Sequence, residues 1–392
     1  MKQPNYILPI IVISQFFCIS LWFAGNGVMN DLISNFDLRK NALGHLTSAV
    51  QLGFILGALI FAIFTIADRY SPSKVFFVSA LLGALCNLGI LWNENNLVSL
   101  LFFRFTTGFF LAGIYPVGMK IAADYYEKGL GKALGFLVGA LVLGTALPHL
   151  LKDMTIAFPW QSVLLVTSTL AVIGGLLIFI FVPDGPFRKP GVSLDYTAFF
   201  GVFKQKEFRS AAFGYFGHMW ELYTFWAFAP VILNTYENLH NPSSFNIPIL
   251  SFFIIGIGGL ACVLGSYISQ KTGTKKMAFI ALSLSCLCCL ICPWMFYFEN
   301  QIIFASFMLF WGMVVIADSP LFSTLIAQNV TPQIKGTALT IVNCIGFSIT
   351  IISIQLLNTL KDYTHSTNIY LVLSIGPILG LMALSKRPKK KT

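Results

Sequence analysis

Two ionisable residues lie three positions apart inside a long apolar stretch. His218 and Glu221 fall within Tyr215–Phe228, where aromatic and aliphatic side chains surround them. Positions i and i+3 of a helix share a face, so both side chains are expected to point the same way. An imidazole and a carboxyl can each bind and release a proton. Glu221 is therefore the first candidate for a proton-exchanging group, with His218 sharing the proton; the alternative is a polar pair that only fixes helix packing.

Two further ionisable residues, Arg104 and Asp318, lie inside other apolar stretches. The guanidinium of Arg104 stays charged in the cell, so it needs an anionic or a carbonyl partner. It either binds a substrate carboxylate or phosphate through paired hydrogen bonds or bonds to a neighbouring helix. Asp318 precedes Ser319-Pro320 and is either a second proton site or a partner for backbone groups that the proline frees. Such groups at membrane depth are functional candidates.

The composition shows what kind of element must carry these residues. Only 10% of the 392 residues are charged and 56% are hydrophobic, whereas soluble globular chains have about 25% charged residues. About 20 residues cross a bilayer as a helix. The apolar stretches are approximately 6–29, 43–66, 73–92, 97–122, 131–151, 160–183, 210–235, 247–269, 275–297, 301–328, 333–358 and 366–385. The sequence thus predicts an all-α polytopic membrane protein with 12 transmembrane helices.

The longest interruption divides the chain into two halves. It runs from Pro183 to Arg209 and contains several prolines and charges. We expect an N-terminal six-helix bundle at 1–183, a cytoplasmic linker at 184–209, and a C-terminal six-helix bundle at 210–392 that ends in a basic tail. Most of the 25 lysines and arginines fall on the side of both termini, which the positive-inside rule assigns to the cytoplasm. The net charge of +10 thus reflects orientation in the bilayer, and no nucleic-acid partner is expected.

An internal repeat relates the two halves. Asp68–Lys74 falls opposite Gln270–Lys276, and Pro116 falls opposite Pro320, at nearly the same offset. Parallel halves related by an axis along the membrane normal are a known transporter architecture. Small residues suggest close helix contacts at Gly53-x-x-x-Gly57 and at Gly135-x-x-x-Gly139.

The chain resembles the major facilitator superfamily over essentially its whole length. The resemblance rests on three features. They are the six-plus-six arrangement, the long central loop, and the signature Gly-x-x-x-Asp-Arg-x-Gly-x-Arg/Lys after the second span. The signature appears here as Asp68-Arg69 followed by Lys74, with Ser71 and Phe64 in place of the two glycines. Two short segments look closest to bacterial permeases of the cyanate-permease-like kind. They are Arg104-Phe105-Thr106-Thr107-Gly108 and Leu21-Trp22-Phe23-Ala24-Gly25-Asn26.

The resemblance implies that spans 1, 4, 7 and 10 line a central cavity, and the embedded polar residues fall on these spans. We take as proton-coupling residues Glu221, His218 and Asp318. The candidate substrate-binding residues are Arg104, Trp22, Asn26, Trp220, Tyr223 and Trp226. The loops after spans 2 and 8 are expected to form a conformational gate with Asp68, Arg69, Lys74, Gln270 and Lys271. Lys120 and Asp124, four positions apart, are expected to pair locally.

The expected function is secondary active transport by alternating access across the bacterial inner membrane. We expect proton-coupled symport of a small organic solute, with an anion as one candidate. A monomer in the lipid bilayer is expected, without a cofactor. Drug–proton antiporters of the family often carry a Gly-Pro pair midway along span 5, but here no proline precedes Pro148, which favours uptake. A proton-coupled efflux antiporter is the alternative, and a channel or membrane sensor a further one.

Other chemistry has little support in the sequence. No phosphate-binding loop of the form Gly-x-x-x-x-Gly-Lys-Ser/Thr is present, so ATP hydrolysis is not expected, and no catalytic constellation indicates an enzyme. The cysteine group is Cys286, Cys288, Cys289 and Cys292. Its flanks are apolar and lack histidines, so these side chains are expected to pack rather than to bind a metal.

Overall fold

The structure is a computed structural model that describes residues 5–126, 130–154, 158–188, 201–240, 245–331 and 334–385. All regular elements within these ranges are helices, as the sequence predicts. Residues 189–200 of the expected linker and the basic tail at 386–392 lie outside the described residues. The chain forms two compact units, one of Met1–Ser193 with Asn246–Gly259 and the other of Leu194–Phe245 with Leu260–Thr392. The division into bundles at 184–209 stays a prediction.

The helices follow the predicted apolar stretches closely. The first unit contains α1 (Ile7–Gly27), α2 (Met29–Asn35), α3 (Ala42–Ile63), α4 (Ile66–Arg69), α5 (Pro72–Leu88), η1 (Gly89–Leu91), α6 (Leu97–Leu111), α7 (Tyr115–Tyr125), α8 (Leu130–Met154) and α9 (Gln161–Phe181). The second contains α11 (Lys206–His240), α13 (Thr274–Met295), α14 (Gln301–Ala317), α15 (Ser319–Gln328), α16 (Lys335–Tyr363), η3 (Thr367–Ser374) and α17 (Ile375–Ser385). Residues of α12 (Ile247–Thr272) belong to both.

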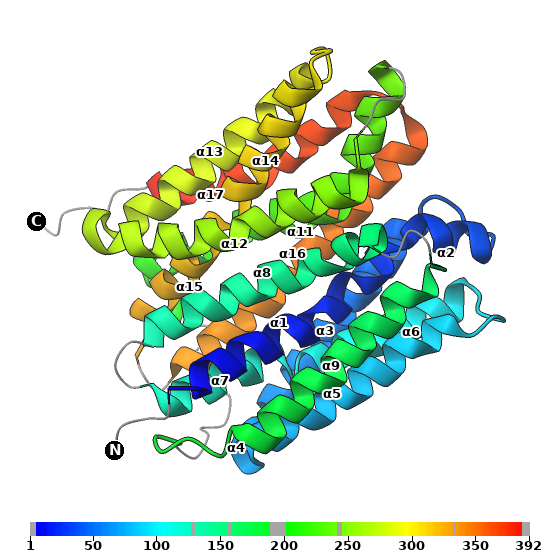
Figure 1. The fold of residues 1–392 in the computed structure, drawn as a ribbon. Coiled ribbons are helices and arrows are strands. Elements are labelled where there is room, and N and C mark those ends of the chain that lie inside the picture. Colours follow the sequence, from blue (N-terminus) through cyan, green and yellow to red (C-terminus); the bar gives the residue numbers. More distant parts are fainter. Residues whose placement is uncertain are drawn as a thin grey trace, which may run out of the picture. The chain divides into compact units, whose positions relative to one another are not determined.

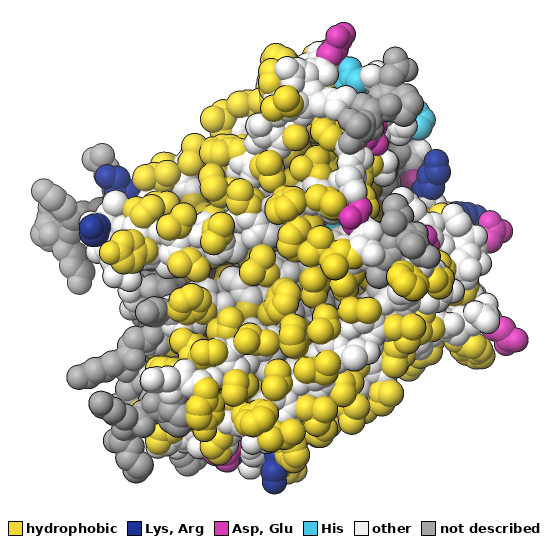
Figure 2. Space-filling view, in the orientation of Figure 1, with side chains coloured by type: hydrophobic (Ala, Val, Ile, Leu, Met, Phe, Trp, Pro, Cys, Tyr) yellow, Lys and Arg dark blue, Asp and Glu magenta, His cyan; other side chains and the backbone are white. Residues whose placement is uncertain are grey.

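The number of spans agrees with the predicted twelve. Ten helical segments of the described chain are long and apolar enough to cross a membrane. Two more helices complete the set: α1, whose apolar part is Ile7–Ile19, and the long α11, which carries the ionisable residues. Figure 2 shows hydrophobic side chains along the helices and charged side chains mainly toward their ends. This distribution suits helices that face hydrocarbon along their length.

Glycines allow two helices of the first unit to pack closely. In this unit α1 lies beside α8 and α9, and α3 lies along α6 (Figure 1). A Cβ atom on Gly53 of α3 would lie 1.9 Å from the carbonyl oxygen of Phe105, and one on Gly108 of α6 would lie 2.1 Å from that of Val50. The predicted close contact at Gly53 is therefore present, whereas Gly135 of α8 has no such neighbour within 4 Å.

The second unit is built around α11. This helix packs against α15, α16 and α17, while α13 packs against α14 and η3. At Gly217 of α11 a Cβ atom would lie 2.4 Å from the carbonyl oxygen of Gly376, so α11 and α17 approach to backbone contact. The close packing places the polar residues of α11 inside the unit.

Spans 4 and 10, predicted as continuous stretches, are each broken into two helices. The first break separates α6 from α7 and the second separates α14 from α15, and Pro116 and Pro320 lie in the first turn after each break. A proline fits the first turn of a helix but lacks the N–H that a continuing helix needs. The aligned prolines of the repeat therefore mark equivalent breaks.

The two copies of the loop signature differ in backbone geometry. Gly273 has φ +91°, a conformation that favours glycine, and precedes α13. Its counterpart Ser71 has φ −59°, which any residue adopts, and precedes α5. The positive φ in the first copy occurs instead at Thr65, with φ +48°. The serine is therefore compatible with the first turn.

Candidate functional site

The centre of the site is the polar face of α11 in the second unit. Pro230 interrupts the backbone pattern further along this helix, but His218 and Glu221 lie in its regular part. Both side chains are buried, with 1% of each residue exposed. Burial of two ionisable groups without partners would be costly. Their partners come from the neighbouring helices.

His218 faces Asp318 at the break between α14 and α15. Its Nδ1 atom lies 2.8 Å from Oδ1 of Asp318, and both side chains are 1% exposed. Apart from this contact with His218, the carboxylate oxygens have no hydrogen-bond partner in the first turn of α15 or elsewhere among the described residues, and His218 Nε2 also lacks a partner. Asp318 therefore does not satisfy backbone groups freed by Pro320. The pair is held by charge, or by one shared proton, in a dry environment.

Glu221 has a different set of partners. Its Oε1 atom accepts hydrogen bonds from Ser285 Oγ of α13 at 2.5 Å and from Trp311 Nε1 of α14 at 2.6 Å. His218 and Glu221 thus share a side of α11, but each contacts other helices rather than the other. The arrangement can hold one proton at the His218–Asp318 pair and exchange another at Glu221.

Sequence reasoning identified neither Ser285 nor Trp311 as a partner of Glu221. A signal was nevertheless present, because Trp311 precedes Asp318 by seven positions and such residues share a helix face. Ser285 stands beside the cysteines of α13, and its role follows only from the packing of α13.

In the first unit, Arg104 bonds to the backbone of α1. Its Nη1 atom donates to the carbonyl of Leu21 at 3.1 Å, and its Nη2 atom donates to that of Trp22. These carbonyls immediately precede Phe23, where α1 departs from helical geometry at φ −107° and ψ 15°. A side chain inserted into the backbone ladder is a recognised cause of a helix bend. These contacts are those expected of the structural alternative for Arg104, and its role in substrate binding stays a prediction.

The other predicted binding residues of α1 lie next to this bend. Asn26 donates to the hydroxyl of Thr47 on α3 at 2.8 Å. The ring of Trp22 lies 4.7 Å from that of Phe54 on the same helix. Both residues are buried, so they join α1 to α3.

The predicted aromatic residues of α11 point in several directions. Trp220 donates from Nε1 to the carbonyl of Val372 at 2.9 Å. Tyr223 and Trp226 are buried and contact each other, with ring centroids 5.2 Å apart, and Tyr223 also lies 5.2 Å from Phe347 of α16. Tyr223 and Trp226 form one aromatic group, while Trp220 belongs to the contact with η3.

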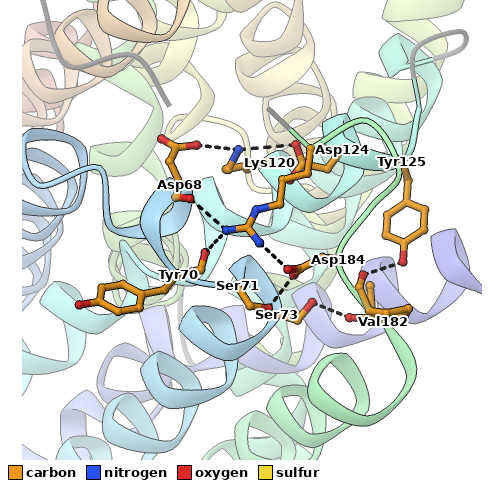
Figure 3. Close-up of polar contacts among 11 residues, drawn as sticks. Asp68, Tyr70, Ser71, Ser73, Lys120, Asp124, Tyr125, Val182 and Asp184 are labelled. Carbon is orange, nitrogen blue, oxygen red and sulfur yellow. Dashed lines mark hydrogen bonds and ion pairs between the residues drawn. The ribbon is translucent and has the colours of Figure 1, made fainter. Parts of the chain in front are cut away.

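The signature loop of the first unit belongs to a polar cluster, the α4 cluster, made of Asp68, Lys120, Asp124, Asp184 and Arg188. Lys120 Nζ lies 2.7 Å from Asp68 and 3.5 Å from Asp124, so the expected local pair is present but the contact with Asp68 is shorter (Figure 3). Lys120 and Asp68 are partly exposed, whereas Asp124 is buried. A partly exposed pair such as Lys120–Asp68 contributes about 1 kcal/mol or less.

Arg188 ties the segment after α9 to the same cluster. It pairs with Asp184, and its Nη2 atom donates to the carbonyls of Asp68 at 3.0 Å and Tyr70 at 2.8 Å. Ser71 Oγ donates to Asp184 at 2.6 Å (Figure 3). Sequence reasoning counted Arg188 only as a cytoplasmic charge, because its contacts depend on how the chain returns after α9.

The remaining predicted gate residues are exposed. Arg69 donates from Nε to the hydroxyl of Thr65 at 3.2 Å, and Lys74 lies in the first turn of α5. Gln270 and Lys271 lie in the last turn of α12. The structure therefore connects Asp68 to the α4 cluster but leaves the other four outside it. No group of three or more His, Cys, Asp or Glu side chains in the described ranges could hold a metal ion.

Comparisons with known proteins agree with this architecture. The chain is 27% identical over 163 residues to the 4-hydroxybenzoate transporter PcaK of Acinetobacter baylyi, a match that covers 39% of this chain and 33% of that protein. It is 21% identical over 280 residues to an uncharacterized transporter of Buchnera aphidicola, covering 69% and 64% of the two chains. The chain thus matches less than two thirds of the length of each of these relatives.

Similarity of fold extends over nearly the whole chain. The structure of the proton:xylose symporter XylE bound to 6-bromo-6-deoxy-D-glucose superposes with a TM-score of 0.74 at 13% identity and covers 96% of this chain and 94% of that chain. A crystal structure of a D-xylose–proton symporter superposes with a TM-score of 0.80 at 15% identity and covers 97% of both chains. The family model of the Major Facilitator Superfamily matches residues 11–354. The assignment to a cyanate-permease-like branch stays a prediction. With this family match, the chain belongs to the major facilitator superfamily of transporters.

Proposed function

We propose that this transporter is a proton-coupled symporter that takes up a small organic solute across the bacterial inner membrane. The observation that carries the proposal is the buried group of His218, Asp318 and Glu221 in the second unit. Both termini are proposed to lie in the cytoplasm, and the protein is proposed to act as a monomer. Asp68, Arg69, Lys74, Gln270 and Lys271 are proposed to act as a conformational gate.

Charge balance supports a proton as the coupling ion. His218 and Asp318 together are neutral when they share one proton. Glu221 then adds one negative charge when it is ionised, and the buried described residues of the second unit include no lysine or arginine to balance it. An unbalanced charge in a dry interior is costly. A second proton on Glu221 removes the charge, so proton uptake and a change of water access are linked.

Two classes of solute are the first candidates. One relative is named a 4-hydroxybenzoate transporter and one structural neighbour a D-xylose–proton symporter. The aromatic pair Tyr223–Trp226 suits stacking on a ring or on the apolar face of a sugar. We propose a hydroxylated aromatic acid first and a sugar second. Arg104 Nη1 and Nη2 each donate to a backbone carbonyl of α1, so the case for an acid rests on the relative.

The substrate is to be found by thermal-shift screening of the purified protein with aromatic acids, sugars and drugs. A solute at 100 times its Kd should stabilise the folded protein by about 2.7 kcal/mol. Hits are then added outside proteoliposomes that contain a pH-sensitive dye. Symport predicts acidification of the lumen, while the alternative, efflux by antiport, predicts that its pH rises. No pH change with any transported hit would contradict proton coupling.

Glu221→Gln tests the residue assignment. The amide cannot exchange a proton, so uptake driven by a pH gradient should be lost. Exchange of labelled solute across the membrane, which needs no net proton movement, should persist in part. An unchanged pH dependence of uptake in the variant would remove Glu221 from the mechanism. Ser283→Ala, on the exposed side of α13, is the control for a general effect of substitution.

A further inference from the structure

We propose that Trp311 is the positioning residue for the Glu221 proton, with Ser285 as its partner. It fixes the carboxyl against α14, so that the protonation state of Glu221 sets how strongly α11 is attached to the span that also carries Asp318. The proposal rests on the proposed proton coupling at Glu221. It concerns neither a substrate contact nor the gate.

The hydrogen-bond geometry gives the direction of the effect. The indole Nε1 of Trp311 is a donor only, so Oε1 of Glu221 must be the acceptor at 2.6 Å. Ser285 donates to the same oxygen at 2.5 Å. Hydrogen bonds to a carboxylate are roughly twice as strong as those to a neutral group. Ionised Glu221 therefore holds α13 and α14 tightly, and protonation loosens both contacts.

Trp311 has a fixed position that does not depend on the carboxyl. Its side chain is fully buried, and its ring lies 4.4 Å from that of Phe225 and 5.7 Å from that of Phe307. Because packing fixes the Trp311 indole, its N–H group sets the position of the Glu221 carboxyl. The carboxyl is therefore the group that changes contact when it takes up a proton.

The same span also contacts the second ionisable residue of α11. Asp318 follows Trp311 by two helical turns and lies 2.8 Å from His218. The titratable groups near Glu221 are His218 on its own helix, Asp318, and the α13 thiols Cys286, Cys288 and Cys289.

The other helices that pack on α11 present neutral groups to this part of it. They are the Ser353 hydroxyl on Thr224 from α16, the Val372 carbonyl on Trp220 from η3, and Gly376 on Gly217 from α17. Tyr370 of η3 contacts Thr235, further along α11. The side-chain donors to Glu221 are thus Trp311 and Ser285, together with the Cys289 thiol of α13.

Infrared pH titration of the purified full-length protein tests the proposal without a substrate. A protonated carboxyl has a carbonyl-stretch band that a carboxylate lacks. Glu221→Gln should remove one such band and thereby assign it. Trp311→Phe keeps the aromatic packing and Ser285→Ala keeps the helix, but each removes one donor to the ionised form. Each should move the midpoint of the assigned band to higher pH by about one unit.

The controls change the same chemical groups where they do not meet Glu221. Trp294→Phe alters an exposed indole of α13, and Ser283→Ala removes a hydroxyl that bonds to its own helix at Phe279. Midpoints in both should match the unmodified protein. If Glu221→Gln removes a band while the donor variants shift no more than the controls, the positioning role is refuted and the proton site stands. If Glu221→Gln removes no titrating band, proton exchange at Glu221 is refuted as well.

Discussion

Arg104 donates a hydrogen bond to the carbonyl oxygen of Trp22, one residue before α1 loses helical geometry at Phe23. Its second terminal nitrogen bonds to the preceding carbonyl, that of Leu21. The buried guanidinium thus contacts the backbone of α1 directly before the bend.

Arg104→Gln should destabilise the protein by about 3 kcal/mol, because a buried group loses charged hydrogen bonds and leaves carbonyls unpaired. The midpoint of thermal unfolding in detergent measures this loss. Arg69→Gln, at an exposed position, should change the stability by about 0.5 kcal/mol or less. An Arg104→Gln variant of full stability that no longer binds an anionic solute would instead support the substrate role.

The His218–Asp318 pair should show strong coupling in a double-mutant cycle. His218→Leu leaves a buried carboxylate with no partner, so a loss of about 3 to 5 kcal/mol is expected. His218→Leu with Asp318→Leu removes both groups, and the loss should be several kcal/mol less than the sum of the single changes. Thermal unfolding of the four proteins at one pH provides the comparison. Additive losses would show that the two side chains do not interact.

The contact between α3 and α6 should depend on the missing side chain of Gly53. Gly53→Ala places a Cβ atom where the Phe105 carbonyl lies, so the helices must separate. Loss of packing of this kind costs about 1 to 3 kcal/mol or more. Gly135→Ala, a matched helical position with open space, should be neutral or stabilising by up to about 1 kcal/mol. Equal effects of the two changes on unfolding would contradict the close packing.

The α4 cluster should contribute modestly and independently of the site in the second unit. Arg188→Gln removes an ion pair and hydrogen bonds to two carbonyls, and about 1 kcal/mol of stability should be lost. Arg209→Gln, an exposed change on α11, is the control. Part of the Arg188 effect should disappear at high salt, because the pair with Asp184 is partly exposed. A loss of stability as large as that of Arg104→Gln would contradict a modest contribution of the α4 cluster.

Much of the fold could be predicted from the sequence, because a helix in a bilayer must be long, apolar and internally hydrogen-bonded. The limits of α3, at Ala42 and Ile63, lie within three residues of the predicted 43–66. The aligned prolines Pro116 and Pro320 correctly indicated equivalent positions. The sequence did not predict that spans 4 and 10 break into two helices at these prolines, because the apolar pattern continues unchanged through each break.

The site was predictable in its residues but not in its pairing. The cost of burying ionisable groups singled out His218, Glu221 and Asp318 without any structure. Helical spacing placed His218 and Glu221 on one side of α11, and it could not separate their partners because those come from α13 and α14. The contacts of Arg188 and Ser285 depend on tertiary packing alone. The roles of these residues in transport stay predictions.

The comparison of Ser71 with Gly273 shows how far the two halves have diverged. A single signature in the sequence encodes two different turns, one with φ −59° and one with φ +91°. Exchange of the two residues would be asymmetric, because glycine at 71 would delete the hydroxyl that meets Asp184, whereas serine at 273 would strain the backbone. A loop moved from one half to the other would therefore have to keep its own residue at this position, because the two copies of the signature adopt different backbone conformations.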